Sequence, residues 1–528
     1  STFRTTSTST TTTTTACGSF YFTGDVVQCP GTDTFCEGDQ CCGAYTCPSA
    51  SPHFVACRRG KQLDCSMSAY DGSSMPSMLE QPLKSISYGP LFVASEECMD
   101  AFSPKCGAGF VSDDVAAAWG QQIWGAPRHD LRNIAGIGAN AVRTYGNDQR
   151  FSKEKFFNEA LQNGLRVVTG LSNYFYTDPS SPGGGCANSG ECHDVIAETF
   201  AQNLRYETGG FSQRRIYHKA IAAVNLMNEP DFIGISGERN YLRTLVSAFD
   251  GFLTAEKRAY ITPWKDGRLP NITATWSFAD SAANGLFVCS KEYHIRNPST
   301  ECGPGLTFMV QFYYVVQDPE GTVGYRPRNK IQQAYAERWV NAFNAFNPPK
   351  FLHDQFVQRY RRLPFFNDIF AFAGEWNPMH PGYNVSNLED DIRQMDQYSE
   401  LPLLGVSFFQ YQVAYNKGGT ERRFGLFELG ATQIGSTSYI LGDDKEAHAV
   451  HCLQPREAVS SIAAAWGGSR NFTGICPQTT ATTTTVTAAT TTETPTTAAD
   501  TTTKVVVSSS RAAGGDEPAT VAGTDVHF

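Results

Sequence analysis

The sequence predicts an α/β chain whose main domain is a (β/α)8 TIM barrel. From about residue 84 to residue 476, short apolar runs alternate with amphipathic stretches. This alternation is typical of strand and helix units wound around a parallel sheet. Eight apolar runs can be distinguished, which is the number of strands that closes a TIM barrel. We therefore expect a barrel domain over residues 84–476.

The candidate strands are the eight short apolar runs of this region. In chain order they are Ser85–Tyr88, Ala139–Tyr145, Arg166–Leu171, Ala222–Met227, Ile272–Trp276, Phe308–Tyr314, Ile369–Ala373 and Gly405–Tyr411. The candidate helices lie between them and carry apolar residues at three- and four-residue spacing. Examples are Lys153–Gln162, Val195–Tyr206, Tyr241–Leu253 and Ile331–Phe343.

The segments outside the barrel differ from it in composition. Residues 1–16 are mostly Thr and Ser, and residues 477–528 are rich in Thr, Ala and Val. Neither has the aromatic and large aliphatic side chains that a core needs, so we expect a Thr-rich tail and a disordered Thr/Ala-rich tail. Residues 17–65 hold eight of the 16 cysteines and are interpreted as a small disulfide-rich module. A structural spacer is favoured there over a carbohydrate-binding knob, because no clear aromatic stripe is present.

The cysteines favour disulfides, and with them a secreted or cell-wall location. Eight cysteines follow the module and fall into close pairs, each of which is able to staple a loop. The pairs are Cys98/Cys106, Cys186/Cys192, Cys289/Cys302 and Cys452/Cys476. Three N-x-Ser/Thr sequons, at Asn271, Asn384 and Asn471, agree with a glycoprotein.

Charge and motif content exclude several classes of function. The net charge is -10, and the basic residues are scattered, so no nucleic-acid partner is expected. No apolar run is long enough to cross a bilayer. The sequence has no phosphate-binding glycine loop, no G-x-S-x-G elbow and no H-E-x-x-H helix, and the histidines do not cluster at ligand spacing. No cofactor and no metal is expected.

Two of the apolar runs end on a glutamate. Ala222–Pro230 places Glu229 at the end of the fourth candidate strand, and Ile369–Asn377 places Glu375 at the end of the seventh. In TIM barrels the catalytic groups lie at the carboxyl ends of the strands, so both side chains are expected at the same mouth. A pair of carboxylates flanking one substrate bond is the arrangement used in glycoside hydrolysis.

These residues resemble the clan of retaining TIM-barrel glycosidases, which have an Asn-Glu pair on strand four and a Glu on strand seven. The run Gly138–Tyr145 looks like the second strand of β-1,3-glucanases and β-1,3-glucanosyltransferases, and Phe409–Tyr411 with Arg423–Phe427 is similar to the eighth-strand region of the transferases. The resemblance covers about 84–476. The triplet Asn228-Glu229-Pro230 is closer to the cellulase and mannanase branch of the clan.

The resemblance implies a role for each site residue. Glu375 would be the nucleophile and Glu229 the acid/base, while Asn228 would hydrogen-bond the sugar 2-hydroxyl. Arg143, at the tip of strand two, would hold Glu375 as an anion.

Three aromatic positions are further candidates. The clan's tyrosine on strand six corresponds to Tyr313, with Tyr314 as its rival, and would hydrogen-bond the nucleophile. Trp376 would offer a flat face to a sugar ring, as would the aromatic side chains of residues 174–176.

We therefore expect a secreted retaining glycosidase that cleaves or transfers a β-linked glucan, with β-1,3-glucan favoured. The choice between hydrolysis and transglycosylation stays open. The enzymatic alternative is a β-1,4-glucanase or mannanase. The alternative from another class is a noncatalytic wall glycoprotein that binds polysaccharide.

Overall fold

The structure, a computed structural model, describes residues 82–91 and 114–477. Short gaps lie at 150, 180, 182, 207, 233–239, 279–294, 399–402, 416–418 and 438–447. Before residue 82 only three short strands are described, β1 (Val26–Gln28), β2 (Phe35–Glu37) and β3 (Ala56–Cys57), which pair into one small sheet within the predicted cysteine-rich module. The predicted tails lie outside the described residues, apart from residue 477.

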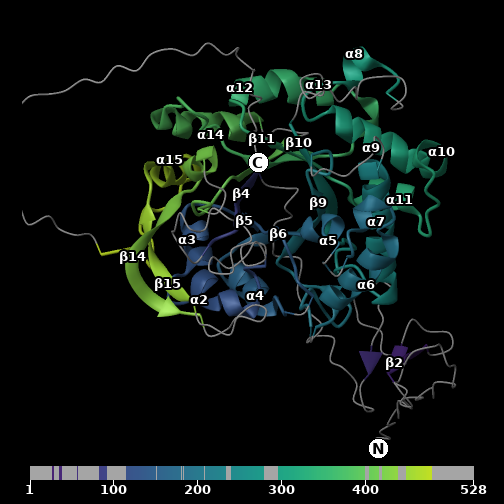
Figure 1. Cartoon of the computed structure of the whole chain (residues 1–528), viewed down its shortest axis with the longest axis horizontal. Helices are drawn as coiled ribbons and strands as arrows, with labels where there is room; N and C mark the ends of the chain where they lie inside the picture. The colour runs from purple at the N-terminus through teal and green to yellow at the C-terminus, as the bar shows by residue number, and fades with distance from the viewer. Residues whose placement is uncertain are drawn as a thin grey trace, which may run out of the picture. The chain divides into compact units, whose positions relative to one another are not determined.

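Eight parallel strands close into one barrel, which confirms the predicted fold class (Figure 1). Each strand pairs with the next along the chain, and the last pairs with the first, in register from Gly405 against Leu83 to Phe408 against Ile86. The barrel strands are β4 (Leu83–Ser87), β5 (Ala141–Arg143), β6 (Arg166–Gly170), β9 (Ile221–Asn228), β10 (Asn271–Ser277), β11 (Asn341–Ala345), β12 (Ala371–Trp376) and β13 (Leu403–Phe408).

Seven of the eight predicted strands overlap barrel strands, and the sixth is wrong. The predicted run Phe308–Tyr314 lies inside the helix α9 (Thr307–Gln317). Nearly all of its side chains are buried, so the segment shows no polar face, and an apolar run of this kind cannot be told from a strand by its pattern. The true sixth strand, β11, lies at the end of the predicted helix Ile331–Phe343, of which only α11 (Ile331–Arg338) is helical.

Helices surround the barrel (Figure 1). The longer ones, besides α9 and α11, are α4 (Glu154–Gln162), α6 (His193–Leu204), α7 (Asn240–Arg258), α14 (Leu388–Tyr398) and α15 (Glu457–Trp466). The shorter ones are α2 (Gln121–Trp124), α3 (Asp130–Gly136), α5 (Tyr174–Thr177), α8 (Pro298–Glu301), α10 (Pro319–Val323), α12 (Pro349–Leu352) and α13 (Gln358–Tyr360). No helix among the described residues is both long enough and apolar enough to span a membrane.

The inside of the barrel is packed with side chains rather than hollow. Its core consists of Leu83, Ala141, Val168, Ala223, Val340, Ala342, Phe372 and Leu404, all nearly inaccessible to solvent. A much larger core fills the space between the strands and the surrounding helices. Because the barrel is filled, only the ends of its strands are open to form a site, as in other TIM barrels.

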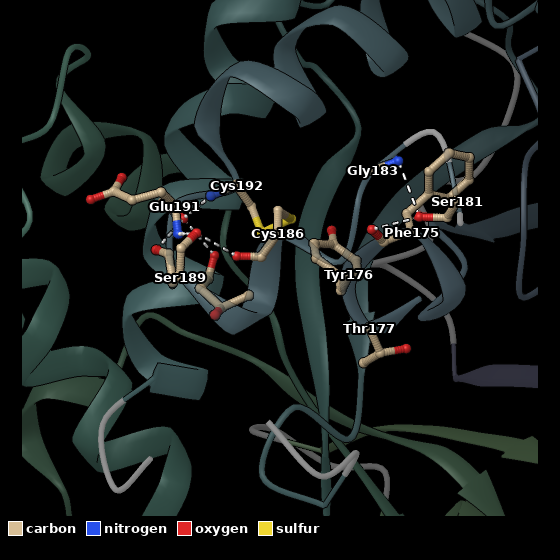
Figure 2. Close-up of a disulfide and its surroundings, with 12 residues drawn as sticks. Phe175, Tyr176, Thr177, Ser181, Gly183, Cys186, Ser189, Glu191 and Cys192 are labelled. Atoms are coloured by element: carbon tan, nitrogen blue, oxygen red, sulfur yellow. Dashed lines mark hydrogen bonds between the residues drawn. A yellow bond between two sulfur atoms is a disulfide. The ribbon is translucent and has the colours of Figure 1, made fainter. Parts of the chain in front are cut away.

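Two disulfides confirm two of the four predicted pairs. Cys186–Cys192 closes the loop between α5 and α6 (Figure 2). Cys452–Cys476 ties β15 (Ala449–Pro455), which pairs with β14 (Phe427–Ser436), to the end of the barrel unit. Cys302 is also in a disulfide, with a partner outside the described residues, and the remaining predicted pair, Cys98/Cys106, lies outside them as well. One further two-stranded sheet joins β7 (Ser212–Gln213) and β8 (Ile216–Tyr217).

Candidate active site

The carboxyl ends of three barrel strands bring together four of the predicted site residues. Asn228 is the last residue of β9, and Glu229 follows it directly. Glu375 lies near the end of β12, and Arg143 is the last residue of β5. Since the strands are parallel, these ends lie at the same mouth of the barrel, as the sequence predicts.

Arg143 is fully buried and donates four hydrogen bonds. One terminal nitrogen, Nη1, lies 2.8 Å from Oε1 of Glu375 and 2.8 Å from the carbonyl oxygen of Gly374. The other, Nη2, lies 2.7 Å from Oδ1 of Asn228 and 3.3 Å from Oγ1 of Thr275. The fork of the guanidinium therefore binds strands β9, β10 and β12 at once and places a positive charge against the Glu375 carboxylate.

Asn228 is held through both its main chain and its side chain. Its backbone N–H donates to Oδ1 of Asn173 at 3.1 Å, and its carbonyl oxygen accepts from Nδ2 of Asn173 at 2.7 Å. Its side-chain Oδ1 accepts from Arg143 and, at 3.2 Å, from Nδ2 of Asn344. Its own Nδ2 donates to none of the described residues, so this amide can still donate to a ligand hydroxyl.

Glu229 adopts an unusual backbone conformation, with φ at 50°. A non-glycine residue in this left-handed region costs of order 1 kcal/mol or more, and such residues are frequent at functional sites. Its N–H donates to the carbonyl oxygen of Thr275 at 2.6 Å, and its Oε1 accepts from Nδ2 of Asn344 at 2.9 Å. The neighbouring strands thus hold the strained turn and the carboxyl group together.

A continuous path of hydrogen bonds joins the two glutamates. It runs from Glu375 to Arg143, then to Asn228, Asn344 and Glu229. Every link is between side chains at the ends of strands β5, β9, β11 and β12. The two carboxyl groups therefore share one cluster, in which Arg143 donates to Glu375 and the neutral amide of Asn344 donates to Glu229.

Two residues of this cluster were not predicted as site residues. Asn344 lies on β11, the strand that the sequence pattern misplaced. Tyr145 lies two residues after Arg143, whose guanidinium is 4.9 Å from the centre of the Tyr145 ring. Burial of the hydroxyl, together with the negative charge of Glu375, raises the pKa of Tyr145 well above its ordinary value. Tyr145 therefore stays protonated beside the carboxylate.

Two predicted aromatic residues do not have the positions expected of them. Tyr313 lies on helix α9 instead of strand six, and its ring stacks on Phe365 with centroids 4.5 Å apart. Its hydroxyl makes no hydrogen bond to Glu375 or to any other described residue. Trp376 is fully buried, and its Nε1 donates to the carbonyl oxygen of Asn347 at 3.0 Å. Its ring is packed in the core, so it offers no face to a sugar in this structure.

The aromatic residues after the third strand also pack inward. Phe175 is nearly buried, and Tyr176 is fully buried with its hydroxyl donating to the carbonyl oxygen of Leu226 at 2.6 Å. Figure 2 shows Tyr176 next to the Cys186–Cys192 disulfide and Phe175 farther from it, next to Ser181. The side chain of Tyr174 lies outside the described residues. Tyr176 thus links this loop to strand β9 through its hydroxyl.

Exposed aromatic rings occur instead after the fourth and sixth strands. Phe232, three residues beyond Glu229, is 42% exposed, and Phe346, two residues beyond Asn344, is 47% exposed. Both follow strand ends at the mouth that holds the glutamates.

Comparison with known proteins finds similarity at the level of solved structures. No family model matches the chain, and no curated protein matches it significantly. Saccharomyces cerevisiae Gas2p in complex with laminaritriose and laminaritetraose is similar with a TM-score of 0.39 and 10% identity, over 75% of this chain and 67% of that one. A GH2 β-galacturonidase from Eisenbergiella tayi is similar with a TM-score of 0.36 and 11% identity, over 74% of this chain and 52% of that one. Values this low assign no activity to this chain.

Proposed function

We propose that this chain is a retaining glycosidase or transglycosylase that acts on a β-linked glucan with Glu229 and Glu375 as its catalytic pair. One observation carries the proposal: two glutamates at the ends of the fourth and seventh strands of one barrel belong to a single hydrogen-bonded cluster. A retaining mechanism needs one carboxylate that stays ionised and one carboxylic acid that gives up a proton.

In the first step, an oxygen of Glu375 forms a bond to the anomeric carbon while the bond from that carbon to the leaving oxygen breaks. Glu229 gives its proton to the leaving oxygen, which departs as a neutral hydroxyl. Arg143 donates to Oε1 of Glu375 at 2.8 Å and places a positive charge beside the nucleophile. Asn228 donates its free amide hydrogen to the sugar 2-hydroxyl, an interaction that strengthens in the transition state.

In the second step, Glu229 acts as a base. Its carboxylate takes a proton from an incoming hydroxyl group, whose oxygen forms the new bond to the anomeric carbon while the bond to Glu375 breaks. Water as the incoming group gives hydrolysis, and a sugar hydroxyl gives transglycosylation. The exposed rings of Phe232 and Phe346 at this mouth are suited to the apolar faces of sugar rings.

For the substrate we propose a β-glucan, with β-1,3-linkage favoured. The support is the resemblance of the run Gly138–Tyr145, which contains both Arg143 and Tyr145, to the second strand of β-1,3-glucan-active enzymes. β-1,4-glucan and mannan are the alternatives, because Asn228-Glu229-Pro230 resembles the enzymes that act on those polymers.

Secretion is part of the same proposal. The two described disulfides fit an oxidising compartment. Asn384 and Asn471 are exposed and accessible to a glycan. Asn271 begins strand β10, and its Nδ2 donates to the carbonyl oxygen of Arg338 at 3.0 Å. We therefore expect glycans at the first two sequons and none at Asn271.

The test is to incubate the protein with reduced β-1,3-gluco-oligosaccharides and to follow product size by mass spectrometry. Shorter products alone would indicate a hydrolase, and longer products a transglycosylase. Glu375→Ala and Glu229→Ala should each abolish turnover of these oligosaccharides. On dinitrophenyl β-glucoside, whose leaving group needs no proton, azide should give opposite anomeric products, an α-glycosyl azide from Glu375→Ala and a β-glycosyl azide from Glu229→Ala.

Glu256→Gln is the matched control, because Glu256 is another carboxylate bonded to a buried arginine, Arg338, at 2.6 Å. It should lower stability and leave turnover of the folded protein unchanged. No turnover of β-1,3-glucans, β-1,4-glucans or mannans would overturn the proposal and favour a polysaccharide-binding role.

A further inference from the structure

We propose that Asn344 is a positioning residue that determines which oxygen of Glu229 carries the acid proton. The inference rests on the proposed function, because it concerns the protonated form of Glu229 in the first step. Arg143 sets the direction of each hydrogen bond in the cluster between the two glutamates.

A guanidinium can only donate hydrogen bonds. Nη2 of Arg143 lies 2.7 Å from the Asn228 side chain, so Asn228 must present its oxygen there. That same oxygen lies 3.2 Å from the Asn344 side chain, which must therefore present its nitrogen. The arginine at the end of strand β5 thus determines, for both amides, which side-chain atom is the oxygen and which is the nitrogen.

The consequence reaches the carboxyl group of Glu229. Nδ2 of Asn344 lies 2.9 Å from Oε1 of Glu229 and can only donate, so Oε1 must accept. When Glu229 is protonated, Oε1 is the carbonyl oxygen and the proton is on Oε2. When Glu229 is ionised, the same N–H still donates to Oε1, and Oε2 takes the proton back from the acceptor. One fixed hydrogen bond thus serves both steps.

The surroundings of Asn344 keep its side chain in this place. It is only 7% exposed, and on β11 it pairs in register with Ser277 on one side and Glu375 on the other. Gly374 leaves the necessary space, because a Cβ atom there would lie 2.6 Å from Cγ2 of Thr275 and 3.2 Å from Oδ1 of Asn344. The glycine before the nucleophile therefore makes room for the amide that orients the acid.

A neutral amide is also the appropriate donor for this role. A cation against Glu229 would favour its ionised form, and the acid proton would be lost. An amide N–H donates to a neutral carboxylic acid and to a carboxylate alike. The Asn344 N–H thus determines which oxygen of Glu229 carries the proton, without favouring loss of that proton.

The test compares two aryl β-glucosides that differ in their need for acid catalysis. A dinitrophenyl group leaves without a proton, whereas a phenyl group needs one. Asn344→Ala should lower kcat/KM, which reports the first step, by about ten-fold to a hundred-fold more for the phenyl glucoside than for the dinitrophenyl glucoside, because general acid catalysis contributes about 100-fold or more. The ratio of the two losses does not depend on how much of the variant is folded.

Asn344→Asp provides the isosteric second variant, since its carboxylate matches the amide in shape and cannot donate to Oε1 when ionised. It should show the same unequal loss, and it carries the test if the alanine variant does not fold. Asn341→Ala is the matched control from the same strand, because Asn341 donates to the Tyr360 hydroxyl at 2.9 Å, within the core. It should lower stability and leave the ratio unchanged.

Equal losses for the two glucosides in both Asn344 variants would overturn the positioning role while leaving the proposed function intact. If the unmodified protein turned over neither aryl glucoside nor any of the polysaccharides, the proposed function and this inference would both fall.

Discussion

Replacement of Arg143 by lysine tests whether the fork of the guanidinium, rather than its charge, organises the barrel mouth. Arg143 uses Nη1 for Glu375 and Gly374 and Nη2 for Asn228 and Thr275. A lysine ammonium has one nitrogen and keeps the charge, so it can stay with Glu375 but cannot also occupy the position of Nη2. The bonds at 2.7 Å to Asn228 and 3.3 Å to Thr275 are lost.

The expected magnitudes follow from these two bonds. A hydrogen bond to a charged group contributes about 1.5–3 kcal/mol, and the longer one less, so Arg143→Lys should lower the free energy of unfolding by about 2–4 kcal/mol. Asn228 would lose the partner that orients its amide toward the sugar. A loss of about 1.5–3 kcal/mol in transition-state binding lowers kcat/KM by about ten-fold to a hundred-fold.

The assay combines denaturant unfolding with kcat/KM on an aryl β-glucoside. Arg338→Lys is the matched control, because Arg338 is also buried and binds Glu256 through both terminal nitrogens, at 2.6 and 2.9 Å. It should lose comparable stability without loss of kcat/KM. If Arg143→Lys lost stability as Arg338→Lys does but retained its kcat/KM, the reasoning about the fork would be refuted.

Two further predictions concern stability. Burial raises the pKa of Asp231, whose carboxylate accepts hydrogen bonds from the N–H and Oγ of Ser277, to about 6. The folded protein therefore keeps a proton that the unfolded chain releases near pH 4, so this residue makes stability fall as pH rises from about 4 to about 6. Asp231→Asn should gain stability relative to the unmodified protein over this range in denaturant titrations at fixed pH, and a constant difference would contradict the argument. Replacing Cys452 and Cys476 by serine should lower the free energy of unfolding by about 3 kcal/mol, measured in the same way, because the disulfide closes a loop with a sequence separation of 24; a loss below about 1 kcal/mol would show that the unfolded chain gains little freedom.

Most of the barrel was predictable because its strands are buried on both faces and read as apolar runs. The run Ala222–Met227 and strand β9 are nearly the same segment. The pattern misses strand β11 because it reads Asn-Ala-Phe-Asn-Ala, in which the polar residues Asn341 and Asn344 interrupt the apolar run although both are buried. The pattern instead predicts the sixth strand at Phe308–Tyr314. This run is part of helix α9, which is so thoroughly buried that it has no polar face. Local patterns record burial, and burial alone does not distinguish a strand from an enclosed helix.

The same limit explains which site residues the sequence could reveal. Glu229 and Glu375 stand out because a carboxylate that ends an apolar run is unusual. Asn344 shows no such contrast along the chain, since its role depends on contacts with Asn228 and Glu229 at the end of strand β9, which are far away in sequence. Trp376 is the opposite case, because its place in the sequence predicts a site residue whereas its ring lies in the core. It lies next to Glu375, but neighbours on a strand point to opposite faces, and its ring belongs to the core outside the barrel mouth.

The different environments of the two glutamates follow from the strands that supply their partners. Both are glutamates at the mouth of one barrel, and two carboxylates in one small site oppose each other's ionisation. Arg143 donates to Oε1 of Glu375 at 2.8 Å, so a positive charge lies beside that carboxylate. It also sets the direction of the hydrogen bonds that lead through two neutral amides to Oε1 of Glu229. In the mechanism that we propose, a single arginine thus places its charge beside the nucleophile and orients the acid, which is the difference that a double-displacement reaction requires.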